Sequence, residues 1–111
     1  ASLMGLSGGI YPNASYQASK GAVVNLTRAL ALEWAADNIR VNAVAPTYIE
    51  TPMVHSVPGV KEMMKDWLRD TPMNRLGQPH EIASVVHFLA SDAASLMTGA
   101  TVQADAGFTC W

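Results

Sequence analysis

Helical periodicity dominates the chain between Ala14 and Asp37. Five side chains recur there at intervals of three and four residues, namely Val23, Leu26, Thr27, Leu30 and Trp34. This spacing predicts one long helix with an apolar stripe along one face. Asn13 can cap the first turn with its side-chain oxygen, and Asn38 tolerates the left-handed conformation at which helices often end.

The pattern changes to alternation directly after this helix. The segment IRVNAVAP, from Ile39 to Pro46, alternates in the manner of a strand and ends on proline. A second strand is expected from Gly99 to Ala104. The opening from Ala1 to Asn13 is rich in Gly and Ser and is interpreted as a loop, with Ala1–Leu3 as a candidate strand end.

Two shorter helices are expected in the second half of the chain. One runs from Val60 to Asp70 and the other from Gln78 to Ala90, where Pro79 fits the first turn. The stretch from Pro46 to Gly59 contains three prolines and is expected to be irregular. A helix that leads into a strand indicates a layered α/β fold. Two parallel strands, however, are fewer than a stable sheet of this kind needs.

Composition and charge narrow the class of protein. The chain has 111 residues, of which 50% are hydrophobic, and a net charge of −2, which suits one domain with a sizeable core. The charges are scattered, so neither nucleic acid nor an anionic membrane surface is expected as a partner. No apolar run approaches the roughly 20 residues of a membrane span, and no signal peptide opens the chain.

The cysteine and histidine residues exclude further classes. The single cysteine, Cys110, cannot form a disulfide within the chain and suits a reducing compartment, so a cytoplasmic location is expected. The three histidines, at positions 55, 80 and 87, are too dispersed for a metal motif. No metal site is expected.

Candidate chemistry lies in the run SYQASK, from Ser15 to Lys20. Tyr16 and Lys20 are four positions apart and therefore share one face of the predicted helix. A nearby ammonium favours the phenolate and lowers the pKa of a tyrosine, which can then exchange a proton with an alcohol or ketone oxygen. The hydroxyl of Ser2, in the preceding loop, is a candidate to hold that oxygen. On spacing alone, the commoner explanation is a tyrosine that packs its ring and a lysine that lies along the surface.

Four ordered motifs change this balance. The run YQASKGAV, with ASLMG before it and IRVNAVAP after it, resembles the Y-x-x-x-K region of the short-chain dehydrogenase/reductase family. PTYIETPM is similar to the family's P-G-x-x-x-T-x-M segment, RLGQPHEIA to the start of its next helix, and TGATVQADAG to its T-G-x-x-x-x-V-D-G-G ending. The motifs span nearly the whole chain. Thr47, Ala104 and Ala106 depart from the family pattern, and Thr47 would be strained if its backbone required a positive φ.

The resemblance implies a fold, an activity and partners. Residues 1–111 would be the C-terminal portion of a single domain, namely the C-terminal part of a Rossmann-like, doubly wound parallel α/β sheet without its glycine-rich N-terminal cofactor half. The activity would be hydride transfer between NAD or NADP and a secondary alcohol or ketone, which is a small-molecule substrate. The long helix would pack against its copy in a homo-oligomer, a dimer or tetramer. The alternative is an inactive fragment or an oligomerisation module that lacks cofactor binding.

The resemblance also assigns catalytic roles to three residues. Tyr16 would be the catalytic acid or base, Lys20 would lower its pKa and bind the nicotinamide ribose, and Ser2 would orient the substrate oxygen. Ser2 lies three residues before Gly5, as the family's serine precedes its glycine. Ser7 and Ser15 are weaker candidates for the same role.

Further residues are implied for the cofactor and the substrate. Besides Tyr16 and Lys20, four residues would bind the cofactor, namely Pro46, Thr47, Ile49 and Thr51. The Ile49 backbone would contact the carboxamide, and Thr51 would reach the phosphates. Tyr11 and Met53 are expected at the substrate together with Ser2. The identity of the substrate and the choice between NAD and NADP stay open.

Overall fold

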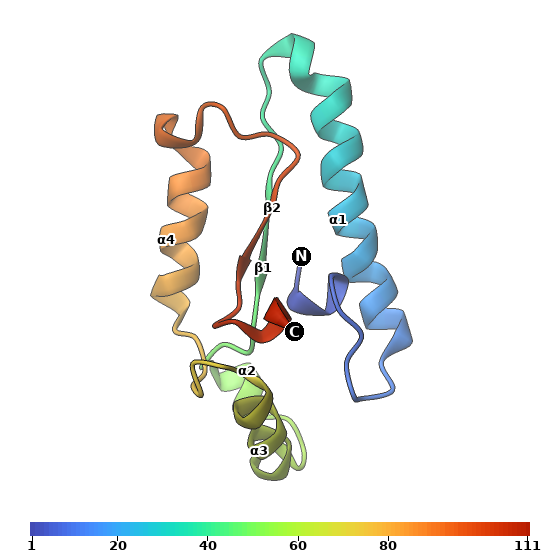
Figure 1. Cartoon of the computed structure of the whole chain (residues 1–111), viewed down its shortest axis with the longest axis vertical. Coiled ribbons are helices and arrows are strands. Elements are labelled where there is room, and N and C mark those ends of the chain that lie inside the picture. The colour runs from blue at the N-terminus through green and yellow to red at the C-terminus, as the bar shows by residue number, and fades with distance from the viewer.

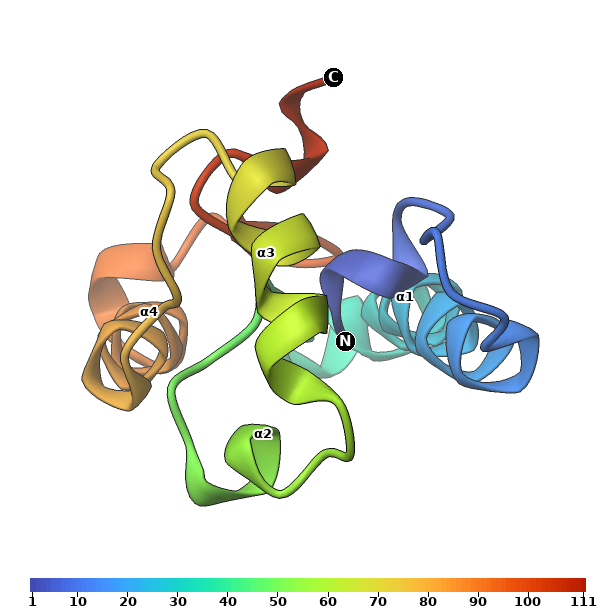
Figure 2. The ribbon, with the colours of Figure 1, turned by 90° about the horizontal axis from the view of Figure 1, so that it is seen from below.

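Two parallel strands form the centre of the molecule. The structure is a computed structural model that describes residues 1–111. Strand β1 (Ala43–Pro46) pairs in parallel with β2 (Thr101–Ala104), so that Ala43 lies opposite Thr101. Helices α1 (Ala14–Trp34) and α4 (Pro79–Ala90) stand on opposite sides of the strands in both views (Figures 1 and 2). This arrangement confirms the α/β class, with only the two strands that the sequence indicated.

The segment after β1 leaves the sheet and forms a separate helical layer beyond the strand's carboxyl end (Figure 1). Helix α3 (Val60–Asp70) has the bounds predicted from the sequence. The short helix α2 (Pro52–His55) lies in the stretch that was expected to be irregular, and that expectation is wrong there. Thr51 caps α2 by accepting a hydrogen bond from the Val54 N–H at 3.3 Å, and Pro52 suits the first helical position.

The first half of the strand expected from Ile39 to Pro46 is not a strand. Side chains replace part of the ladder here: the Val41 N–H donates to Thr98 Oγ1 at 3.1 Å, and only the Val41 carbonyl accepts from a backbone group, the Gly99 N–H at 2.7 Å. The Arg40 guanidinium donates to three backbone carbonyls, those of Leu89, Ser91 and Met97. The Asn42 amide donates to the Met97 carbonyl at 2.8 Å and accepts from the Ala100 N–H at 3.1 Å. The ladder therefore begins only at Ala43.

The first residues also differ from expectation. Ala1–Leu3 contains no strand; a single 3-10 turn covers Leu3–Gly5 instead. Asn13 does not cap α1 with its side chain, because its amide oxygen is already engaged by the side chain of Gln17. At the other end the prediction is confirmed. A 3-10 turn follows α1, and Asn38 adopts the left-handed conformation at φ 59°.

The buried face of α1 shares only Thr27 with the predicted stripe. The buried residues are Val24, Thr27 and Ala31, whereas Leu26 is 54% and Trp34 39% exposed. Small residues face the core because the chain approaches α1 closely there. A Cβ atom built on Gly99 would lie only 3.4 Å from the Ala31 Cβ.

The core is thin for a chain of this length. Nine apolar residues are buried, namely Leu3, Met4, Val24, Ala31, Ala43, Ala45, Trp67, Leu89 and Ala94. The radius of gyration is 15.1 Å, compared with about 13 Å for a compact domain of this size. Several large apolar side chains on α1 and α4 consequently stay exposed. None of the helices combines the length and the apolarity that a membrane crossing requires.

Candidate active site

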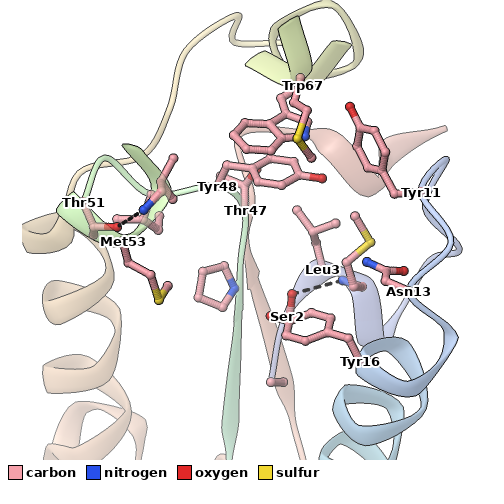
Figure 3. A pocket seen from close by; sticks show the side chains of 16 residues that line it. Ser2, Leu3, Tyr11, Asn13, Tyr16, Thr47, Tyr48, Thr51, Met53 and Trp67 are labelled. Carbon is pink, nitrogen blue, oxygen red and sulfur yellow. Dashed lines mark hydrogen bonds between the residues drawn. The ribbon is translucent and has the colours of Figure 1, made fainter. Parts of the chain in front are cut away.

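A cavity of about 590 Å³ opens at the carboxyl end of β1. Its wall comes from the first residues of the chain, the start of α1, the segment after β1, and α3 (Figure 3). Ligands of open α/β sheets bind at this edge, outside the carboxyl ends of the strands. The topology alone therefore makes the cavity the first place to look for chemistry.

Helix α1 presents Tyr16 to this cavity (Figure 3). The residue lies in the first turn and is 46% exposed. Lys20 lies one turn further on, outside the cavity wall, with its Nζ 5.3 Å from the centre of the Tyr16 ring. The ammonium makes no ion pair or hydrogen bond within the chain, so it is free to act on the tyrosine or on a ligand.

Ser2 shares the cavity with Tyr16, and Figure 3 shows the two side chains at the same edge of it. The Ser2 Oγ accepts a hydrogen bond from the Met4 N–H at 3.2 Å, which fixes the hydroxyl in place. Ser7 and Ser15, the weaker candidates, do not line this cavity. Ser2 is therefore the serine that the fold places beside Tyr16.

Gly5 explains how the two segments come so close. The 3-10 turn that carries Ser2 packs directly on the α1 backbone. A Cβ atom at Gly5 would lie 2.5 Å from the carbonyl oxygen of Lys20, which is far inside normal contact. Only glycine permits this packing without displacement.

The last residue of β1, Pro46, and the segment after it line the opposite wall, where Thr47, Ile49 and Thr51 also face the cavity. The Thr47 N–H continues the ladder by donating to the Ala104 carbonyl at 3.3 Å. The backbone of Thr47 does not have a positive φ. The strain considered for threonine in place of glycine does not arise.

A parallel bridge holds Ile49 against Gly77. The Glu50 N–H donates to the Gly77 carbonyl at 2.8 Å, and the Gly77 N–H donates to the Tyr48 carbonyl at 2.9 Å. In this pattern the bonds come from the neighbours of Ile49. The N–H and C=O of Ile49 itself make no hydrogen bond within the chain, which leaves one donor and one acceptor beside the cavity.

Sequence reasoning missed an aromatic wall formed by Tyr48 and Trp67. Their rings stack with centres 4.0 Å apart and planes 8° from parallel. Trp67 is buried and Tyr48 half-buried. The tyrosine sits inside the PTYIETPM motif, so an aromatic residue between Pro46 and Thr51 was the available signal. Trp67 lies on α3, for which the sequence predicted a helix but no contact with the site.

The cavity thus contains three tyrosines, and their surroundings separate them. Burial, with a smaller contribution from Tyr11, raises the pKa of Tyr48 to about 12. Burial and then Asp66 also raise the pKa of Tyr11, whose hydroxyl donates to Asp66 Oδ2 at 3.3 Å. Of the three tyrosines, Tyr16 is the one with an ammonium beside its ring.

The remaining predicted contact residue, Met53, also lines the cavity, with 75% of its surface exposed. Asn13 lines it as well, although it was expected only to cap the helix. No group of three or more His, Cys, Asp or Glu side chains is arranged to hold a metal ion.

Comparisons with known proteins identify similar sequences and structures. A family model described as enoyl-(acyl carrier protein) reductase matches residues 1–109. A galactitol 2-dehydrogenase from Rhizobium johnstonii is 65% identical over 100 residues, which make up 90% of this chain and 39% of that relative.

Solved structures match over the whole chain. The crystal structure of gox2181 is 54% identical with a TM-score of 0.95, and the match covers 100% of this chain and 44% of that one. A proposed 2-deoxy-D-gluconate 3-dehydrogenase from Agrobacterium tumefaciens, solved with bound NADP, is 41% identical with a TM-score of 0.91, and the match covers 100% and 45%. A 4-hydroxyisoleucine dehydrogenase among the matches was solved with NADH. The chain spans about two fifths of the length of the curated relatives it matches.

Proposed function

The chain belongs to the short-chain dehydrogenase/reductase family, and on that premise we propose that the full-length protein is an NAD(P)-dependent dehydrogenase of secondary alcohols. One observation carries the proposal. Tyr16, with Lys20 beside its ring and Ser2 at the same edge, faces a cavity at the carboxyl end of parallel strands. Residues 1–111 are the C-terminal portion of the enzyme's single domain in this proposal.

The mechanism assigns the proton to Tyr16. Its phenolate accepts the hydroxyl proton of the alcohol in oxidation, and its phenol returns that proton to the carbonyl oxygen in reduction. In this mechanism the Lys20 ammonium, 5.3 Å from the centre of the Tyr16 ring and without an ion-pair partner, stabilises the negative charge that develops on the tyrosine oxygen during proton transfer. Ser2 orients the substrate oxygen by hydrogen bonding.

The segment after β1 fits the nicotinamide side of a cofactor. NAD or NADP supplies the hydride acceptor in this class of reaction. A carboxamide needs one donor and one acceptor, and the free N–H and C=O of Ile49 offer this pair. Pro46 and Thr47 line the same wall. The Thr51 hydroxyl is held in place because it caps α2, and it is the candidate to donate a hydrogen bond to a phosphate oxygen of the cofactor.

A polyol is the substrate class that we propose first. The galactitol 2-dehydrogenase at 65% identity acts, by its name, on a sugar alcohol. Away from the wall assigned to the cofactor, the cavity brings polar groups from Ser2, Tyr11 and Asn13 to a mainly apolar lining. Several hydroxyl groups of one substrate could find partners there.

The test removes a single oxygen atom. Tyr16→Phe in the full-length protein should lower kcat for galactitol oxidation by about 10²- to 10⁴-fold, the usual contribution of a positioned acid or base, while NAD(P)H still binds by fluorescence titration. Ser15→Ala is the matched control, because its hydroxyl is exposed and outside the cavity. Undiminished turnover in Tyr16→Phe would contradict the mechanism. Absence of both turnover and cofactor binding in the unchanged protein would favour the alternative of an inactive or purely oligomerising module.

A further inference from the structure

A second cavity of about 310 Å³ adjoins the candidate active site. It lies between the loop at residues 7–11, helix α3 and the C-terminal residues Phe108 and Trp111. Four residues line both cavities, namely Met4, Tyr11, Tyr48 and Trp67. They are therefore a partition between two spaces rather than the outer wall of one.

Two residues of the partition, Trp67 and Tyr11, are anchored by other contacts, whereas the Tyr48 side chain is held only by its ring. Trp67 is 5% exposed and anchored in α3, and Tyr11 is held by its hydrogen bond to Asp66. Tyr48 is half-buried, and its hydroxyl makes no hydrogen bond within the chain. Its ring lies flat on Trp67 and meets the edge of Phe108 at 6.3 Å between ring centres. The Tyr48 ring thus separates the first cavity from Phe108, which lines the second cavity.

The buried indole of Trp67 gives Tyr48 a flat support. Trp67 is 5% exposed, and the planes of the two rings are 8° from parallel. Stacking of this kind favours one position of the Tyr48 ring, which keeps the ring in the partition.

We propose that the stacked rings of Tyr48 and Trp67 set the upper limit on substrate length by closing the active-site cavity against the second cavity. The proposal rests on the proposed function and adds the residue that determines specificity. Substrate chains that reach the ring of Tyr48 stop gaining contacts. Chains in a variant without that ring continue into the space lined by Phe108.

The experiment measures length dependence in the full-length protein. A series of 2-alkanones, from 2-butanone to 2-decanone, is assayed as substrates with NAD(P)H. For 2-alkanones that turn over slowly, the constants for their inhibition of polyol oxidation are measured instead, and these give the same dependence on chain length. In the unchanged protein, kcat/KM or affinity should rise by about fourfold for each added methylene and then level off at a defined length. In Tyr48→Ala the rise should continue for several further carbons.

Two variants control for shape and for folding. Tyr48→Phe keeps the ring on Trp67, so its profile should level off at the same length as that of the unchanged protein. Tyr48→Leu keeps part of the volume and should level off between the alanine variant and the unchanged protein, which gives a usable measurement should Tyr48→Ala unfold.

The outcomes separate this proposal from the proposed function. A profile in the unchanged protein that never levels off overturns the length limit, as does a plateau that stays in place in Tyr48→Ala. In either case the proposed dehydrogenase function would still be supported if the unchanged protein oxidises galactitol and Tyr16→Phe does not. Loss of the plateau in Tyr48→Phe would also contradict the proposal, because the ring would still close the cavity.

Discussion

Single atoms decide the geometry around Tyr16. The contact between Gly5 and the backbone of Lys20 brings Ser2 to the tyrosine, and a side chain at Gly5 has no room because its nearest neighbours are backbone atoms. Backbone atoms cannot move aside as the end of a flexible side chain can. Distances between hydroxyls at this site therefore depend on the absence of one methyl group.

Gly5→Ala should consequently damage both stability and catalysis in the full-length protein. Overpacking of this kind destabilises by about 1–3 kcal/mol, and a displacement of Ser2 by 1 Å can lower kcat by about 10²-fold. Denaturant unfolding and steady-state kinetics with galactitol measure the two effects. Gly8→Ala is the control, because the nearest atom to its added Cβ is a side-chain oxygen 4.0 Å away. Equal behaviour of the two variants would contradict the proposed role of Gly5.

At the scale of secondary-structure elements, α4 shows how local hydrogen bonds fix a helix. The Glu81 carboxylate accepts a hydrogen bond from the Gln78 N–H at 2.8 Å and two from the Arg75 guanidinium, at 2.7 and 2.8 Å. Arg75 and then Gln78 lower the pKa of Glu81 to about 2. The carboxylate thereby satisfies an N–H group at the helix start that has no partner in the helix.

This contribution should depend on pH in a defined direction. The pKa of Glu81 in the folded state lies below its unfolded value near 4.3, so the stabilisation is present at neutral pH and is lost as the pH falls from about 4.5 towards 2. Glu81→Gln should lower the melting temperature at pH 7, and the difference from the unchanged protein should shrink towards pH 3. Glu62→Gln, which breaks an exposed pair with Lys65, should change little at either pH. A pH-independent difference for Glu81→Gln would contradict the argument.

The same elements show what the sequence could predict. Periodicity and end signals located α1, α3 and α4, because these features are local. The start of β1 was mispredicted. Arg40 and Asn42 form hydrogen bonds with residues between Leu89 and Ala100, about 50 to 60 positions away. No local sequence pattern encodes partners at that distance. The buried face of α1 was mispredicted for a related reason, as close approach by Gly99 selects Ala31 over the larger residues nearby.

The candidate site divides in the same way. Motifs predicted Ser2, Tyr16 and the segment after β1, and the fold places them on one cavity. The stack of Tyr48 on Trp67 joins a loop to a helix 19 positions away, so it depends on tertiary packing and could not be predicted. The structure also shows the consequence of one departure from the family pattern, the alanine at position 106 in place of glycine. Ala106 adopts a φ of 54°, which costs a residue with a side chain about 1–2 kcal/mol relative to glycine.

At the scale of the whole molecule, the uncovered apolar faces are the main feature. Val23, Leu26 and Trp34 lie on one face of α1 and are exposed, while the adjacent face packs on the core. An apolar helical stripe gains stability only when another surface covers it. We propose that this face of α1 lies in the interface of a homo-oligomer, in keeping with the assembly expected from the sequence.

Leu26→Glu should therefore weaken association of the full-length protein. A charge in an apolar interface would be buried without a partner, which is strongly unfavourable, so sedimentation velocity should show a shift to smaller species at micromolar concentration. Asn25→Glu adds the same charge about 100° round the helix from Leu26, outside the stripe and at an exposed position, and should leave the sedimentation profile unchanged. A lower melting temperature in Leu26→Glu without any change in mass would contradict the interface, because it would mean that the face is covered by residues of the same chain.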